Sequence, residues 1–336
     1  MSLAPSLEKL SRGELFTPAD IDAAFAIIMN GDAAHEDIKH FLNLTQPHMR
    51  EPAWIAGGAR ALRSRMVRVT APDGAIDVCG TGGDGAHTLN ISTAVAFVVA
   101  GCGVTVAKHG NRAMSSKSGA ADVLEALGVK LTGDVATLER CLRDAGVAFL
   151  FAQNHHPAMR HVALARRELG KRTIFNLLGP LSNPAGVKRQ LVGVFSADYA
   201  EPMARALAEL GCERALVVHG AGGLDELSAA GKDANHVATL ENGAVSMQLA
   251  AMNAEVHPDL RGGVAMENAE EMRALLSGAG RQGHRAAVLI NAAAALFVAG
   301  HSPSAVEAHA AAGLSIDTGA AREALQRLID VSRSAP

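Results

Sequence analysis

The chain has 336 residues, of which 49% are hydrophobic and 19% are charged, and its formal net charge is −3. A chain of this length can bury a large core in one large domain or two smaller ones, and it is too apolar for intrinsic disorder. The negative net charge argues against a general nucleic-acid binder. Aromatic residues, at 3%, are too scarce for base-stacking platforms.

Cysteine usage and hydropathy indicate the compartment. Four cysteines are far apart and form no Cys-x-x-Cys pair, which predicts buried thiols in a reduced compartment rather than a disulfide framework or a zinc site. No basic-then-apolar secretion signal occurs at the N-terminus. The uncharged stretches 88–107 and 286–300 are interrupted by polar residues or too short to span a bilayer. We therefore expect a cytoplasmic protein without membrane contact.

Residues 1–70 have only helical patterns. Thr17 followed by Pro18 is a typical helix start, and Gly31 is a typical helix end. Further helical segments are expected near 36–44 and 52–66. We expect a small all-helical N-terminal domain.

From Ala75 onward, short β-branched strands alternate with helical patterns. The expected strands are 75–79, 104–107, 147–151, 190–195 and 214–219, followed by a hairpin or edge strands near 236–249. The expected helices are 91–101, 120–127, 135–144, 199–210, 268–277, 285–299, 304–312 and 319–332. This alternation predicts an α/β domain with a mostly parallel central sheet covered by helices. In such sheets ligands bind beyond the carboxyl ends of the strands, so we expect the loops after the first, second and fifth of these strands on one edge.

A glycine-rich loop follows the first predicted strand. Gly80–Gly85 satisfies the G-x-G-x-x-G pattern of dinucleotide-binding folds. Such a site also needs an acid at the end of the next strand, where this chain has Lys108 and His109. No Gly-Lys-Ser/Thr follows, which excludes a P-loop. A plain tight turn is the structural alternative.

Cations and short polar side chains surround this loop in the predicted fold. Lys108, Arg112 and Lys117 occur within ten residues of one another, and Asn90–Thr93 places three polar side chains at a helix start. Glycine-loop and helix-terminal N–H groups bind anions, and Lys and Arg add positive charge. These features together predict a diphosphate site, although a solvated basic loop is the plainer alternative.

Two neighbouring acids, Asp225 and Glu226, follow the strand predicted at 214–219. Acids in a first helical turn are common, so a purely structural role is open. On an edge that also binds phosphate, carboxylates are useful when a cation lies between them. Mg²⁺ is bound by few protein carboxylates together with water and phosphate oxygens. We therefore predict that one or two Mg²⁺ ions bridge the acid pair and a diphosphate.

Six motifs occur in order and cover nearly the whole chain. They are 77–84 (Asp-Val-Cys-Gly-Thr-Gly-Gly-Asp), 90–93 (Asn-Ile-Ser-Thr), 108–112 (Lys-His-Gly-Asn-Arg), 118–128, 172–184 and 223–226 (Gly-Leu-Asp-Glu). Together they resemble the anthranilate phosphoribosyltransferase family. The resemblance implies a helical domain (1–70, joined by a helical segment near 165–185) beside an α/β domain (71–336), in a homodimer paired through the helical part. It also implies that anthranilate and phosphoribosyl diphosphate give N-(5-phosphoribosyl)anthranilate and diphosphate, a step of tryptophan biosynthesis.

The resemblance also implies site residues by motif position. The phosphoribosyl diphosphate site would comprise Gly80, Gly83, Asp84, Thr88, Asn90, Ile91, Ser92, Thr93, Lys108, His109, Gly110, Asn111, Arg112, Ala113, Met114, Ser115, Ser116 and Ala120. The anthranilate contacts would be Gly80, Asn111 and Arg166, and the magnesium contacts would be Ser92, Asp225 and Glu226. For catalysis, Lys108 would stabilise the leaving diphosphate, Arg166 would clamp the anthranilate carboxylate, and His109 would take the amine proton or be structural.

The chain departs from the family pattern at Ala120, where the family commonly has a serine that contacts the diphosphate. A hydrogen bond to a charged group contributes roughly 1.5–3 kcal/mol, so its loss weakens substrate binding unless Ser116 or Ser118 replaces it.

Three other functions stay open at this point. A pyrimidine nucleoside phosphorylase-like enzyme would use a similar Lys-His-Gly-Asn-Arg loop but has less need of the acid pair. A non-catalytic nucleic-acid-binding paralogue would need a basic face. An NAD-dependent oxidoreductase would need an acid where Lys108 stands. The favoured partners are small-molecule substrates, without nucleic acid.

Overall fold

The computed structural model describes residues 2–112, 117–229, 234–251 and 260–334, and in this part of the chain seven strands form one sheet. The strand order is β3-β2-β1-β4-β5-β6-β7; neighbours from β3 to β5 are parallel, and β5, β6 and β7 pair antiparallel. The strands are β1 Ile76–Gly80, β2 Val106–Gly110, β3 Val147–Phe151, β4 Arg189–Gly193, β5 Arg214–His219, β6 Ala234–Glu241 and β7 Ala244–Ala251. The predicted mostly parallel α/β sheet is confirmed, including its terminal hairpin.

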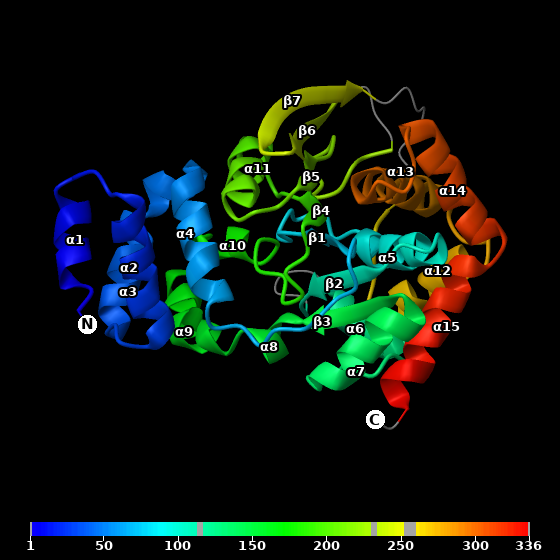
Figure 1. The fold of residues 1–336 in the computed structure, drawn as a ribbon, viewed down its shortest axis with the longest axis horizontal. Coiled ribbons are helices and arrows are strands. Elements are labelled where there is room, and N and C mark those ends of the chain that lie inside the picture. Colours follow the sequence, from blue (N-terminus) through cyan, green and yellow to red (C-terminus); the bar gives the residue numbers. More distant parts are fainter. Residues whose placement is uncertain (1, 113–116, 230–233, 252–259, 335–336) are drawn as a thin grey trace.

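The central strands are buried on both faces because helices cover both sides of the sheet (Figure 1). In β1 the side chains of Ile76 and Val78 belong to one hydrophobic core and that of Cys79 belongs to the other. Successive side chains of a strand point to opposite faces, which explains why the predicted parallel strands are nearly continuous apolar runs.

One face of the sheet is covered by helices from the middle and the C-terminal part of the chain. Helix α5 packs on β1 and β2, α13 packs on β4 and β5, and α14 and α15 pack on α5. The elements of this group are α5 Ile91–Gly101, α6 Ala120–Leu127, α7 Val135–Arg140, the π-helical turn η2 Cys141–Ala145, α12 Ala265–Leu276, α13 Gln282–Ala299, α14 Ala305–Asp317 and α15 Ala320–Arg333.

The other face packs on α11, which also contacts α4 and so connects the sheet to the N-terminal helices. Helices α1 to α3 and α9 lie at the end of the molecule opposite α14 and α15 (Figure 1). The elements of this group are α1 Ala4–Ser11, α2 Pro18–Asn30, α3 His35–Leu44, η1 Gln46–Arg50, α4 Pro52–Arg63, α8 Ala152–His155, η3 Pro157–Met159, α9 Arg160–Leu169, α10 Phe175–Leu178, η4 Ala197–Tyr199 and α11 Ala200–Glu209.

Helix α2 begins and ends where the sequence predicts. The Thr17 side chain and Asp20 form a capping box, Pro18 is in the first turn, and Gly31 ends the helix with a φ of +81°. Glycine adopts this left-handed backbone conformation at little cost, which explains why the helix ends at Gly31.

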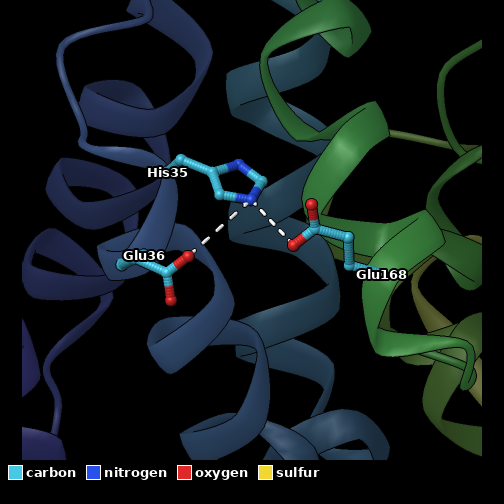
Figure 2. Close-up of side chains that lie close together, drawn as sticks. All are labelled: His35, Glu36 and Glu168. Carbon is cyan, nitrogen blue, oxygen red and sulfur yellow. Dashed lines mark hydrogen bonds and ion pairs between the residues drawn. The ribbon is translucent and has the colours of Figure 1, made fainter.

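Helix α9 is fastened to the N-terminal helices by ion pairs. Glu168 lies 3.0 Å from the Nε2 atom of His35 on α3 (Figure 2). It also lies 3.1 Å from the Nζ atom of Lys39 on the same helix. The chain thus returns to the helical end after β3. One hydrophobic core runs continuously from Leu3 to the strands of the sheet, so the domain boundary at residue 70 stays a prediction.

The described residues contain no helix that combines the length and the apolar character needed to cross a bilayer. Their four cysteines are unpaired, and three of them, Cys79, Cys141 and Cys212, are buried as predicted, whereas Cys102 is half-buried. Burial raises the pKa of each thiol.

The helical end has an aromatic core centred on Phe25. Its ring lies 5.4 Å from that of Phe41, 6.0 Å from Phe175 and 6.4 Å from Trp54, and its side chain is fully buried. Phe175 follows α9, so this core also holds the returning segment.

We expect Phe25→Ala to destabilise the protein by about 3–5 kcal/mol, because it leaves a large cavity. The midpoint of urea unfolding should fall with an unchanged slope. Val306→Ala on α14 is the matched control, since Val306 is 79% exposed. Equal midpoints for the two variants would contradict a shared aromatic core.

Candidate functional site at the carboxyl edge of the sheet

The loop that carries Asp225 and Glu226 crosses directly over the carboxyl ends of three strands. A Cβ atom at Gly193, the last residue of β4, would lie 1.5 Å from the carbonyl oxygen of Asp225. A Cβ atom at Gly80, the last residue of β1, would lie 2.5 Å from the Asp225 carboxylate. At Gly220, just after β5, it would lie 2.1 Å from the carbonyl oxygen of Glu226. Only glycine at these positions allows the acids to lie this close to the sheet.

The glycine loop after β1 is bonded to this acid loop. The Gly82 N–H donates to the Asp225 Oδ2 atom at 2.7 Å, and the Asp225 N–H is 3.3 Å from the Asp84 Oδ2 atom. Gly82 and Gly83 have φ values of +66° and +73°, which require glycine. The structure therefore brings together the predicted metal ligands and the glycine loop, which is predicted to bind phosphoribosyl diphosphate, the donor of the phosphoribosyl group. The predicted binding site of this substrate is called the donor site below.

The start of α5 completes the same edge. The backbone N–H of Ser92 donates to the Glu226 Oε1 atom at 3.1 Å, and the Ser92 hydroxyl lies 3.1 Å from the Lys108 Nζ atom. All three predicted magnesium contacts, Ser92, Asp225 and Glu226, are thus grouped. The predicted anion-binding N–H groups of Gly82 and Ser92 bind the protein's own carboxylates here.

The positions of Lys108 and His109 correct a prediction. Both were expected in a loop beyond the second strand, but they lie within β2 and are buried. The Lys108 ammonium donates to the carbonyl oxygen of Val78 at 2.7 Å. The strand continues past the apolar residues because the buried Asp77 carboxylate on β1 accepts the His109 N–H, and its charge favours the charged form of Lys108.

Asp77 is a buried acid for which the sequence alone predicted no role. It accepts the backbone N–H of His109 at 3.0 Å and the Asn183 Nδ2 donor at 2.7 Å. Burial raises the pKa of Asp77, while Asn183 and Lys108 lower it. An acid inside the apolar run Ile76–Cys79 was the available signal.

The site holds more negative than positive charge, because Asp225, Glu226 and Asp84 are half-buried side by side there. Burial, followed by the charge of Asp84, raises the pKa of Asp225 to about 7. Burial, followed by the charge of Asp225, raises the pKa of Glu226 to about 8. Lys108 opposes the rise at Glu226. Oxygen donors with unbalanced negative charge suit Mg²⁺, so the residues present fit that ion.

His109 has both ring nitrogens engaged. Its Nδ1 atom lies 3.1 Å from the carbonyl oxygen of Gly179, and its Nε2 atom lies 3.1 Å from the His156 Nε2 atom. Burial and then the neighbouring His156 lower the pKa of His109 well below its ordinary value, so the ring is neutral at pH 7. This arrangement favours the structural alternative for His109 over that of proton acceptor.

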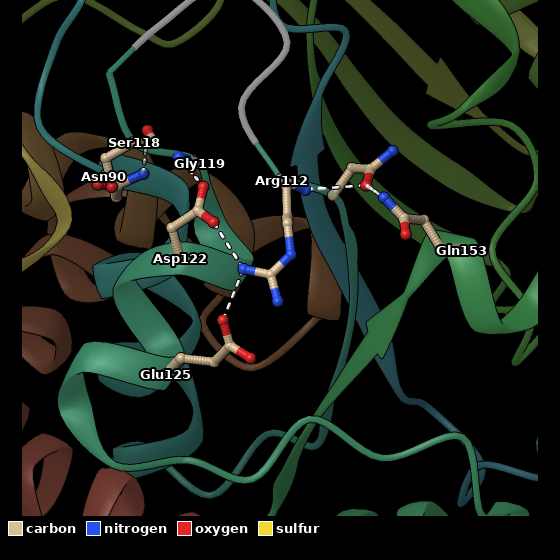
Figure 3. A network of polar contacts seen from close by, with 8 residues as sticks. Asn90, Arg112, Ser118, Gly119, Asp122, Glu125 and Gln153 are labelled. Atoms are coloured by element: carbon tan, nitrogen blue, oxygen red, sulfur yellow. Dashed lines mark hydrogen bonds and ion pairs between the residues drawn. The ribbon is translucent and has the colours of Figure 1, made fainter. Parts of the chain in front are cut away.

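Arg112 is bound by carboxylates on α6 (Figure 3). Its Nη1 atom lies 2.7 Å from Asp122 and 2.6 Å from Glu125, and the Gly119 N–H also donates to Asp122 at 2.9 Å. Glu125 and then Asp122 raise the pKa of Arg112. The Arg112 cation therefore fastens the end of β2 to α6, and Lys117 is exposed.

The remaining predicted donor-site residues lie on the same edge. Thr88 forms a bridge with Arg261, and Asn90, the residue before α5, donates from its side chain to the carbonyl oxygen of Ser118. Ile91 and Thr93 are buried in α5, Gly110 ends β2, and Ala120 starts α6. Ala113, Met114, Ser115 and Ser116 lie outside the described residues.

The predicted anthranilate contacts come from two parts of the molecule. Gly80 ends β1 and Asn111 directly follows the neighbouring strand β2; the Asn111 side-chain oxygen accepts from Gln153 at 3.5 Å. Arg166 lies on α9, with its guanidinium 5.9 Å from the ring centroid of Phe175. Between described residues, no hydrogen bond joins Arg166 to Gly80 or Asn111.

A second set of metal-type donors lies away from this edge. Atoms of His35, Glu36 and Glu168 lie within 4.8 Å of one another (Figure 2). Lys39 forms ion pairs with both glutamates, at 3.2 and 3.1 Å, and already supplies the positive charge. This cluster is therefore explained as a surface ion-pair network.

Residues 72–322 match the model of the glycosyl transferase family, a/b domain. The class of protein that the fold and the edge site define is thus a glycosyltransferase.

Relatives narrow the assignment. Anthranilate phosphoribosyltransferases of Methylobacterium nodulans (48% identity, 99% of each chain) and Rubrobacter xylanophilus (47%, 98% of each) match the whole length. The solved Thermus thermophilus enzyme of that name has a TM-score of 0.90 at 38% identity, covering 98% of this chain and 99% of its own. A Saccharomyces cerevisiae enzyme in complex with PRPP and Mg has a TM-score of 0.88 at 27% identity, with 99% and 98% covered.

The chain belongs to the anthranilate phosphoribosyltransferase family. The resemblance seen in its motifs is confirmed, and the nucleoside phosphorylase, nucleic-acid-binding and oxidoreductase alternatives are set aside.

We expect Gly193→Ala to lower turnover by about 10²-fold, because the new Cβ must displace the Asp225 backbone, and an ångström of misplacement costs this much. Steady-state kinetics measure it. Gly313→Ala on α14 is the control, since nothing lies within 4 Å of a Cβ there. Turnover equal to that of the control would contradict the close crossing.

The acid pair should also make stability depend on pH. The folded-state pKa values of Asp225 and Glu226, about 7 and about 8, lie above their ordinary values of 3.8 and 4.5. Their contribution to stability is therefore complete below about pH 4 and is lost as pH rises through 7 to 8. Without magnesium, Asp225→Asn with Glu226→Gln should raise the thermal midpoint relative to the wild type far more at about pH 8.5 than at about pH 4. A difference independent of pH would contradict the buried-charge account.

Proposed function

We propose that this chain transfers the phosphoribosyl group of phosphoribosyl diphosphate to the amino group of anthranilate, releasing diphosphate, as a step of tryptophan biosynthesis. The observation that carries the proposal is the bonded contact of the acid loop with the glycine loop and the start of α5, at one edge of the sheet. Family membership supplies the reaction, and this edge supplies groups suited to its leaving group.

The donor site extends over the glycine loop, the start of α5 and the end of β2. Its N–H groups at Gly82 and Ser92 lie where a diphosphate can exchange places with the protein's carboxylates. Asp225, Glu226 and the Ser92 hydroxyl would hold Mg²⁺, which supplies positive charge to the leaving diphosphate when bound. The yeast relative, found with PRPP and Mg, supports this assignment.

Negative charge develops on the leaving diphosphate and positive charge develops on the ribose. Oriented N–H groups at the edge stabilise the first without reorganising during the reaction. Lys108 acts without touching the diphosphate, because its ammonium is bonded to the Val78 carbonyl and the Ser92 hydroxyl. It adds positive potential at the site and orients the Ser92 hydroxyl. Anthranilate is an aromatic amine that is already neutral at pH 7, so positioning contributes much of the acceleration.

The acceptor site, which would bind anthranilate, lies between the end of β2 and α9. Gly80 and Asn111 would line it, and the Arg166 guanidinium would pair with the anthranilate carboxylate. Burial lowers the pKa of Arg166, and no carboxylate among the described residues forms an ion pair with it. A yeast relative in complex with 4-fluoroanthranilate supports binding of this class of compound.

We also propose that two copies pair through the helical end. Leu15 and Leu164 there are 91% and 44% exposed, so apolar side chains are available for burial. The helical region 1–70, joined by 165–185, would then be one domain and 71–336 the other.

Reduced cysteines support a cytoplasmic location.

The direct test mixes anthranilate, phosphoribosyl diphosphate and Mg²⁺ and follows the loss of anthranilate fluorescence. The wild type should consume anthranilate only when both other components are present. Asp225→Asn with Glu226→Gln should stay folded but require at least about tenfold more Mg²⁺, or lose turnover, because two charged ligands are removed. Unchanged magnesium dependence and rate would remove these residues from the metal site.

Arg166→Ala should raise the KM for anthranilate by about tenfold or more, because a charge-assisted pair with the carboxylate is lost. The KM for phosphoribosyl diphosphate should change by less than about twofold. Equal effects on both constants would argue that Arg166 is structural.

A further inference from the structure

Arg172 touches the donor loop from the helical side of the molecule. It follows α9, and its Nη2 atom donates a hydrogen bond to the carbonyl oxygen of Gly83. Its guanidinium carbon lies 4.2 Å from the ring centroid of Phe195, just after β4. Its own carbonyl oxygen accepts from Gln46 on η1 at 3.1 Å. One residue therefore connects the N-terminal helices, β4 and the glycine loop.

These contacts restrict the guanidinium in both position and direction. A planar guanidinium stacked on an aromatic face loses little further freedom when it forms a hydrogen bond. Phe195 is itself fixed, because its N–H donates to the Thr81 hydroxyl at 3.0 Å and its side chain is buried. The Phe195 ring is thus a platform that holds Arg172 beside the loop.

Holding the Gly83 carbonyl also orients the next N–H. The peptide between Gly83 and Asp84 is planar and trans, so the Asp84 N–H points opposite to the carbonyl oxygen that Arg172 binds. On its other side the loop is held by Asp225 through the Gly82 N–H. Gly82, Gly83 and Gly85 all have positive φ and bring no side chain to restrict the loop. Within the loop only Asp84 adds a side-chain bond among the described residues, to the Ala86 N–H, so the bonds from Asp225 and Arg172 do much to set its conformation.

We propose that Arg172 is a positioning residue for phosphoribosyl diphosphate: it fixes the glycine loop in the conformation that receives the diphosphate. It acts through the loop and not by touching the substrate. This inference rests on the proposed function, because it deepens the donor site described above. It also means that the helical end, through Gln46 and Arg172, contributes to binding of the donor.

The test compares Arg172→Gln and Arg172→Lys with Arg167→Gln, a change at an exposed arginine on α9. Arg172→Gln should raise the KM for phosphoribosyl diphosphate roughly tenfold and leave that for anthranilate within about twofold. Arg172→Lys keeps a donor and a cation above Phe195 and should recover part of the loss. Arg167→Gln should behave as the wild type.

Calorimetric titration with phosphoribosyl diphosphate and Mg²⁺ separates this idea from the proposed function. If the wild type binds the donor but does not consume anthranilate, the proposed function fails, and weaker donor binding by Arg172→Gln still supports the positioning role. An unchanged donor constant in Arg172→Gln, a proportional rise in both constants, or no recovery by Arg172→Lys would overturn it. Failure of the wild type to bind the donor would overturn both.

Discussion

The structure depends on one close approach: the backbone that carries Asp225 and Glu226 passes over the ends of β1, β4 and β5 with no room for a side chain beneath it. Gly80, Gly193 and Gly220 provide that room. Because the strands are parallel, their ends lie on one edge, and the glycine loop and α5 start there. The acid pair, the loop amides and the helix terminus are consequently in direct contact.

This approach conflicts with stability. The Asp225 and Glu226 carboxylates are half-buried beside Asp84, and Asp77 is fully buried near them. Lys108 is a buried cation close to these acids, and a carbonyl and a hydroxyl group accept hydrogen bonds from its ammonium. Charged groups buried without full compensation are costly, and they persist where function needs them. A divalent cation and an anionic substrate together would restore the balance. The same groups that weaken the ligand-free protein thus prepare it to bind a metal and a diphosphate.

Much of the fold could be predicted from the sequence, because short apolar runs between amphipathic segments are typical of covered parallel strands. The edge location of the glycine loop and the acid pair followed from the same rule. The extension of β2 through Lys108 and His109 could not be predicted, since it depends on Asp77 from another strand. The pairing of Arg112 with Asp122 and Glu125 and the contact of Arg172 with Phe195 likewise arise from tertiary packing.

The most direct measurement is a crystal structure of the protein with Mg²⁺ and phosphoribosyl diphosphate. The account predicts metal density on Asp225 and Glu226, with the diphosphate between the glycine loop and the start of α5. The Gly82 and Ser92 N–H groups should then have exchanged a carboxylate partner for phosphate oxygens. A donor bound away from this edge, or metal density that avoids both acids, would contradict it.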